Sequence, residues 1–186
     1  MSGINNQQQQ EVARALADDH SEVDKLIQRL LAALDQENKS QSFELLDLLW
    51  ARLAVHIRAE HLCLFPSILE VPPVNFIGSG GIPGYQEAKS VIDRLRLDHE
   101  FLMRELGKAV NMMREQSTHS DHDIRVRLPN VRRSIVKVQS RLLIHNQLEE
   151  EHIYKWVNVL LGDANRSTLI ARIRHEIENI PPRFNV

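Results

Sequence analysis

The sequence predicts an all-α protein, most simply an antiparallel four-helix bundle in up-down-up-down order with a short C-terminal helix. Apolar residues recur at helical steps of three, four and seven along four long segments, and no segment shows the alternation of a β-strand. The connections between the segments are short, which favours antiparallel neighbours. A chain of 186 residues can bury one core, so one domain is the simplest organisation.

The first two predicted helices cover residues 11–36 and a segment that begins near Ser40. Their apolar stripes consist of Val12, Leu16, Val23, Ile27, Leu30 and Leu34, and of Phe43, Leu46, Leu49, Leu53 and Ile57. Pro66 is expected to kink or end the second helix, because proline lacks the backbone N–H that a helix interior needs. The glutamine-rich residues 1–10 are predicted to form a disordered tail.

A loop and two more helices complete the predicted bundle, which spans residues 11–162. Residues 71–85 concentrate proline and glycine and are predicted to be a loop. The third helix is expected over residues 86–115, closed by the polar stretch QSTHSDHD. The fourth is expected to begin near Pro129, a suitable first-turn residue, and to end near Leu161. The stripe of the third helix consists of Ile92, Leu95, Leu102, Leu106 and Val110, and that of the fourth consists of Ile135, Val138, Leu142 and Leu148.

Residues 163–186 are predicted to hold a short amphipathic helix, over residues 167–179, and a tail. The apolar residues of this helix are Leu169, Ile170, Ile173 and Ile177. They could dock on the bundle itself, on a second copy of the chain, or on an output partner.

Composition excludes several classes of partner. The formal net charge is −2, the pI is about 6.5, and basic residues are spread among acidic ones, so no nucleic-acid partner is expected. No apolar run approaches the roughly 18 residues of a membrane span, and no signal peptide is expected. Cys63 is the one cysteine, which favours a reducing compartment. The predicted location is the cytoplasm.

Ionisable residues interrupt the apolar stripe of the second helix. In the stretch HIRAEHLCLF, His56 lies four positions before Glu60, so both side chains share one helix face. Burying a neutral polar group without partners costs on the order of 2–7 kcal/mol, and a charge costs more. A metal ion is one partner that would offset this cost.

The same pair occurs again in the fourth helix. RLAVHIRAEHLCLF, at residues 52–65, aligns with RLLIHNQLEEEHIY, at residues 141–154, and this places His145 and Glu149 opposite the first pair. The helices before them also match, since each carries a histidine directly after an aspartate, in DDH and in LDH. The chain is therefore predicted to be two helix pairs of one design.

The four histidines are expected at one level of the bundle. His20 lies about 18 residues before the turn near Asn38, and His56 lies about 18 residues after it, so an antiparallel arrangement brings them to the same height. His99 and His145 lie about 21 and 25 residues from the second turn. Four histidines and two glutamates are thus predicted to converge in one layer of the core.

This donor set indicates a metal centre. Six imidazole and carboxylate ligands exceed the needs of one tetrahedral zinc, and no thiolates are present for a structural zinc site. Nitrogen and oxygen donors suit iron, with manganese or zinc as second choices. If each glutamate bridges two ions and each ion takes two histidines, every ion has four protein donors. An oxo or hydroxo bridge adds a fifth, which leaves one position for a small diatomic or anionic ligand.

The order of these motifs resembles the hemerythrin-like family, also called HHE cation-binding domains. The resemblance covers about residues 12–160. It implies a non-haem di-iron centre, oxo- or hydroxo-bridged, in an up-down-up-down bundle. The metal ligands that it implies are His20, His56, Glu60, His99, His145 and Glu149.

Two departures from the family narrow the function. Oxygen-carrying hemerythrins have a His-x-x-x-His pair on the third helix, whereas the residue four positions after His99 is Met103. The iron-cluster repair branch has an N-terminal cysteine-containing domain, whereas this chain has glutamines there. A ferritin-like site needs Glu-x-x-His on two helices, and only Glu149 with His152 fits that pattern.

Two classes of function remain open. The first is a di-iron module that binds oxygen, nitric oxide or iron for sensing, storage or stress protection. The second is a di-iron redox enzyme that acts on oxygen, peroxide or nitric oxide. Residues 71–85 could gate access to the centre, because loops at helix ends often control entry. A metal-free bundle of satisfied polar groups is the competing structural hypothesis.

Other polar residues have less specific patterns. Cys63 and His152 each follow a predicted ligand histidine by seven residues and are expected to face inward, Cys63 as a small apolar group or as a redox group. Asp19 and Asp98 either orient ligand histidines or lie at the surface. The surface or loop histidines are expected to be His61, His119, His122 and His175.

Overall fold

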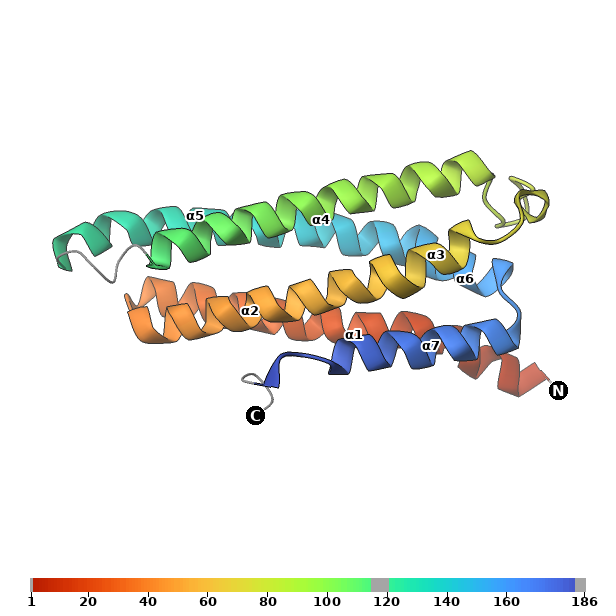
Figure 1. Cartoon of the computed structure of the whole chain (residues 1–186), viewed down its shortest axis with the longest axis horizontal. Helices are drawn as coiled ribbons and strands as arrows, with labels where there is room; N and C mark the ends of the chain where they lie inside the picture. Colours follow the sequence, from red (N-terminus) through yellow and green to blue (C-terminus); the bar gives the residue numbers. More distant parts are fainter. Residues whose placement is uncertain (1, 115–120, 183–186) are drawn as a thin grey trace.

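The computed structural model describes residues 2–114 and 121–182, and within these ranges the all-α class is confirmed. The only β feature in the described part is an isolated bridge between Ser79 and Ile82. Figure 1 shows α1, α2, α4 and α5 with their long axes side by side, and each of them packs against two of the others. No helix among the described residues is both long enough and apolar enough to cross a membrane.

The first helix pair consists of α1 (Ser2–Asp35) and α2 (Lys39–Ala59). Glu37 adopts a positive φ of 54°, which ends α1, and the Asn38 side chain accepts a hydrogen bond from the Gln41 backbone N–H and caps α2. The predicted disordered tail is corrected for residues 2–10, because α1 begins at Ser2. Glutamine is a fair helix former, so these residues can extend a helix that is already nucleated.

The second helix does not end at Pro66. After α2 the chain makes a π-helical turn, η1 (Glu60–Leu64), and continues as α3 (Phe65–Leu69), where Pro66 occupies the first turn and needs no backbone donor. The predicted loop follows and contains one 3₁₀ turn, η2 (Pro73–Asn75).

The second helix pair is interrupted in the same way. Here α4 (Tyr85–Arg114) is followed by α5 (Asp121–Leu148), then a second π-helical turn, η4 (Glu149–Ile153), and α6 (Tyr154–Leu160). The fourth helix therefore begins before Pro129 and not at it, which corrects the predicted boundary. Residues 115–120, in the polar stretch expected to close the third helix, lie outside the described residues.

Two apolar clusters fill the core, and every histidine of the predicted metal layer lies between them. On α1, Leu16 belongs to one cluster and Val23 to the other, with His20 between. On α4, Leu95 and Leu102 flank His99 in the same way. The predicted stripes are largely buried, although Phe43 is 37 % exposed. The polar layer is thus enclosed by apolar side chains at both ends.

The C-terminal helix α7 (Asp163–Glu178) packs on α1 and α2. Leu169, Ile170 and Ile173 are buried in one of the two apolar clusters. The Arg58 side chain donates hydrogen bonds from α2 to the Glu176 carboxylate and backbone carbonyl. Most of the apolar face that the sequence offers for a partner is therefore covered by the chain's own bundle.

Replacing Pro129 by alanine should stabilise the protein. Pro129 is exposed and lies inside α5, where its ring removes one helical hydrogen bond, so P129A should raise the free energy of unfolding by roughly 1–3 kcal/mol. Urea denaturation followed by circular dichroism measures this change. A loss of stability would instead mean that the helix starts at Pro129, as the sequence alone predicts.

Candidate metal centre

The structure brings all six predicted ligand residues together in the layer between the apolar clusters. The histidines come one from each of the four long helices, and the glutamates are the first residues of the two π-helical turns. None of the six residues is more than 7 % exposed: they are His20, His56, Glu60, His99, His145 and Glu149. Residues from distant parts of the sequence therefore share one buried site.

The ligand atoms form two groups that share Glu60. One group contains His20, His56, Glu60 and Glu149, and the other contains Glu60, His99 and His145. Within each group the atoms lie within 4.8 Å of one another. Within each helix pair the two histidine Nε2 atoms are 3.2 Å apart.

Each glutamate faces both histidine pairs. Glu60 Oε1 lies 2.8 Å from His56 Nε2, and its Oε2 lies 2.8 Å from His99 Nε2. Glu149 Oε1 lies 3.5 Å from His145 Nε2, and its Oε2 lies 3.3 Å from His20 Nε2. Both carboxylates thus join the first helix pair to the second, which is the arrangement that a pair of carboxylate-bridged ions requires.

Both glutamates begin a π-helical turn, a feature that the sequence did not reveal. The Phe65 N–H donates to the Glu60 carbonyl, and the Tyr154 N–H donates to the Glu149 carbonyl, five residues apart in each case. Pro66 cannot be the general cause, because Lys155 occupies the matching position of the second turn. Single π-helical turns inside α-helices are frequent at functional sites, where they change which way side chains face.

Aspartates orient one histidine of each pair from outside the site. Asp19 Oδ2 lies 2.8 Å from His56 Nδ1, and its other oxygen accepts a hydrogen bond from Arg52. Despite burial, which raises it, the pKa of Asp19 is lowered by His56 and Arg52. In the second pair, Asp98 Oδ2 is 3.7 Å from His145 Nδ1, and Arg141 donates to Oδ1. A carboxylate at Nδ1 leaves Nε2 free to face the site.

His61 also belongs to the site, which corrects its predicted surface location. Its Nε2 lies 2.8 Å from His99 Nδ1, and its side chain is half-buried. Burial and the neighbouring His99 lower the pKa of His61, which favours its neutral form, so a single hydrogen lies between the two facing nitrogens. The internal repeat could not show this role, because the matching residue is Glu150.

The two helix pairs differ at Tyr154, whose counterpart has no hydroxyl. Its hydroxyl donates to Glu149 Oε2 at 3.2 Å, and its ring stacks beside His20 with centroids 6.5 Å apart. Burial and the charge of Glu149 raise the pKa of Tyr154 well above its usual value, so the hydroxyl keeps its proton. The matching residue is Phe65, which stacks beside His99 at 5.9 Å and has no hydroxyl.

The charges at the centre are strongly coupled. Burial alone would lower the pKa of His56 and raise that of Glu60. Their mutual attraction outweighs burial, so the pKa of His56 lies well above its usual value and that of Glu60 well below. For His145, attraction to Glu149 and Asp98 overcomes burial and raises the pKa to about 10.

The buried oxygens of Glu60 test whether a metal fits. Both oxygens lie close to imidazole nitrogens, yet neither makes a hydrogen bond of acceptable geometry with a described residue. Glu149 Oε1 is likewise without a hydrogen-bond partner among the described residues. Buried carboxylate oxygens without such partners are costly, and cations that take nitrogen and oxygen ligands would satisfy them. The residues present therefore fit a metal pair.

The other candidate residues lie outside the two ligand groups. Cys63 is buried in an apolar cluster, and burial raises the pKa of its thiol. Its surroundings are those of a small apolar side chain and not of a reactive thiolate. His152 is half-buried with its ring 5.2 Å from that of Trp156. Met103 packs against the opposite apolar cluster, and His175 is exposed. His119 and the side chain of His122 lie outside the described part of the structure.

Comparison of the chain with protein-family models, with curated proteins and with solved structures returned no match. The assignment of a function therefore depends on the geometry of the site.

The metal-free protein should lose stability as the pH rises. The pKa of His145 is raised from 6.5 to about 10 in the folded chain, so the stability contributed by its protonated form is complete below pH 6.5 and disappears as the pH passes 10. Denaturation of chelator-treated protein at several pH values between these limits measures the decline. H145Q should flatten it, and a metal-free stability that rises over this range would contradict the charge arrangement.

Proposed function

We propose that this chain is a hemerythrin-like, non-haem di-iron protein in which an up-down-up-down four-helix bundle holds the two ions. The observation that supports the proposal best is the pair of buried glutamates, each with one oxygen toward the histidines of each helix pair. The proposed setting is the cytoplasm, where a single free cysteine stays reduced.

The donor chemistry favours iron. The two ligand groups contain imidazole and carboxylate and no thiolate, because Cys63 lies in an apolar cluster apart from them. Such donors suit iron, with manganese and zinc as second choices, and the presence of two groups around shared glutamates argues against one structural zinc. When bound, the ions would supply redox chemistry and a coordination position for a small diatomic or anionic ligand.

The surrounding residues prepare this site. Asp19 holds the orientation of His56 and His61 holds that of His99, each at 2.8 Å, and Asp98 lies 3.7 Å from His145 on the matching side. The two apolar clusters enclose the ligand layer at both ends along the bundle. Met103, four positions after His99, packs against an apolar cluster and adds no ligand, so an open position for a small ligand is expected on at least one ion.

A binding module is the function that we favour, and its role would be sensing, storage or stress protection. One observation favours a redox enzyme as the second candidate. The Tyr154 hydroxyl, buried and hydrogen-bonded to Glu149, could supply a proton beside the metal pair. The matching residue of the first helix pair is Phe65, which has no hydroxyl, so packing at this position does not require the hydroxyl of Tyr154.

Two iron ions per chain are expected after expression with sufficient iron and purification without chelator. H56A removes one buried ligand and should lose most of the metal, whereas H175A changes an exposed histidine of α7 and should keep it. Elemental analysis of the three proteins measures the stoichiometry. One tightly bound zinc, or equal metal content in both variants, would contradict the proposed centre.

Small anions and nitric oxide should change the optical spectrum of the loaded protein. Azide is the probe for the oxidised centre and nitric oxide for the reduced centre, because each needs a free coordination position. A full metal content with no spectral response to either probe would mean a closed, structural centre. Y154F should retain the azide response, and a loss of peroxide turnover in that variant alone would favour the enzyme.

A further inference from the structure

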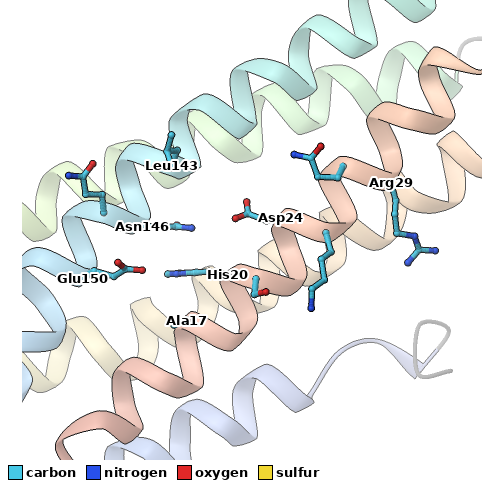
Figure 2. A pocket seen from close by; sticks show the side chains of 11 residues that line it. Ala17, His20, Asp24, Arg29, Leu143, Asn146 and Glu150 are labelled. Atoms are coloured by element: carbon cyan, nitrogen blue, oxygen red, sulfur yellow. The ribbon is translucent and has the colours of Figure 1, made fainter.

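A groove of about 770 Å³ opens from the surface between α1 and α5, and His20 forms part of its lining. Figure 2 shows the His20, Asn146 and Glu150 side chains directed into the space between the two helices, with Asp24 further along. The groove therefore leads from solvent to a residue of the ligand layer. This opening lies between helices. The loop of residues 71–85, which the sequence suggested as a gate, lines a second hollow through Val71, Pro72 and Asn75, next to His61.

His20 is the least constrained of the four histidines. Described side chains lie beside the Nδ1 atoms of the other three. Asp19 is 2.8 Å from His56 Nδ1 and His61 is 2.8 Å from His99 Nδ1, whereas Asp98 is 3.7 Å from His145 Nδ1, an ion-pair distance without a hydrogen bond. His20 Nδ1 has no hydrogen-bond partner among the described residues, although the residue is only 7 % exposed. Since an outer partner fixes the orientation of a ligand histidine, His20 is the one most able to turn.

The groove presents atoms that attract a cation. Asp24 and Glu150 form no hydrogen bond or ion pair with any described residue, and the side-chain oxygen of Asn146 is buried without a partner. Two cations also line the groove. Lys25 is held by Glu22, with 2.7 Å between Lys25 Nζ and Glu22 Oε1, and Arg29 lies at the end of the lining far from His20 and Glu150 (Figure 2). Carboxylate oxygen, amide oxygen and imidazole nitrogen are donors that divalent transition-metal ions accept.

The opposite side of the site is less suited to a cation. There His61 stands at His99 in the position that corresponds to Glu150 in the repeat. The hollow behind His61, of about 600 Å³, is lined by Arg172 as well as by Glu70. The Arg172 side chain donates to the Leu62 carbonyl, which leaves a fixed positive charge in this hollow.

We propose that the groove between α1 and α5 is the entry route for divalent metal ions, with Glu150 and Asn146 as the residues that first take the ion and His20 as the ligand that turns to admit it. The inference rests on the proposed dinuclear centre, which it extends by assigning a loading site. Glu150 directly follows Glu149 in the sequence, so an ion bound by Glu150 would lie next to the residue that is proposed to bridge the two ions.

Stopped-flow absorption of cobalt(II) uptake by the metal-free full chain tests the route. E150Q should slow uptake at least about tenfold, since it removes an attracting charge, and should reach the wild-type final amount of cobalt. S21W, at an exposed position of the groove lining, should slow uptake by obstruction. E70Q is the matched control, because it removes an exposed carboxylate from the other hollow, and should load at the wild-type rate.

The outcomes separate the two proposals. Wild-type protein that takes up no cobalt or other metal would overturn the proposed function together with the route. Wild-type protein that loads fully, with E150Q and S21W at the same rate, would overturn the route alone. Slowing by E70Q and not by E150Q would overturn it as well, since entry would then pass through the hollow behind His61.

Discussion

The constraint on which this structure depends is the burial of two carboxylates at the junction of two helix pairs. Glu60 and Glu149 are fully buried, and each extends one oxygen toward its own helix pair and one toward the other. Buried carboxylates without compensation would be strongly destabilising. The histidines answer this need directly, and the apolar clusters on either side confine the polar groups to a single layer. The four long helices are therefore held at one relative height by polar contacts as well as by packing.

The two halves share this frame but differ in the residues around it. The aspartate, arginine, histidine and glutamate positions repeat, whereas His61 corresponds to Glu150, and Phe65 to Tyr154. The repeated residues form two neighbouring groups that could each hold a metal ion. On one side, His61 contacts the Nδ1 atom of His99. On the other side, His20 Nδ1 has no hydrogen-bond partner among the described residues, and His20 lies beside the groove and Tyr154. A symmetric scaffold can thus give two ions different surroundings.

Much of the candidate site could be predicted from the sequence, because a spacing of four residues defines a helix face and the internal repeat identifies matching positions. These two rules were enough to identify the six residues that the structure brings together. The π-helical turns could not be predicted, since no local residue pattern marks them: Pro66 follows the first turn and Lys155 holds the matching position after the second. The contact of His61 with His99 could not be predicted either, because the internal repeat places Glu150 at the matching position. Two predictions were wrong: a helix that begins at Pro129, and a disordered tail over residues 2–10. In both places a neighbouring helix continues through the residues that were expected to lie outside it.

The same charges explain how a chain with this core can fold before it meets metal. Attraction between Glu60 and His56 raises the pKa of the histidine and lowers that of the glutamate, and Glu149 does the same for His145. The metal-free core therefore holds imidazolium and carboxylate partners, and not isolated charges. If the proposed metal centre forms, each ion that enters displaces protons from these histidines, so metal uptake and proton release are coupled. In its absence, the attraction between imidazolium and carboxylate offsets part of the cost of burying both groups.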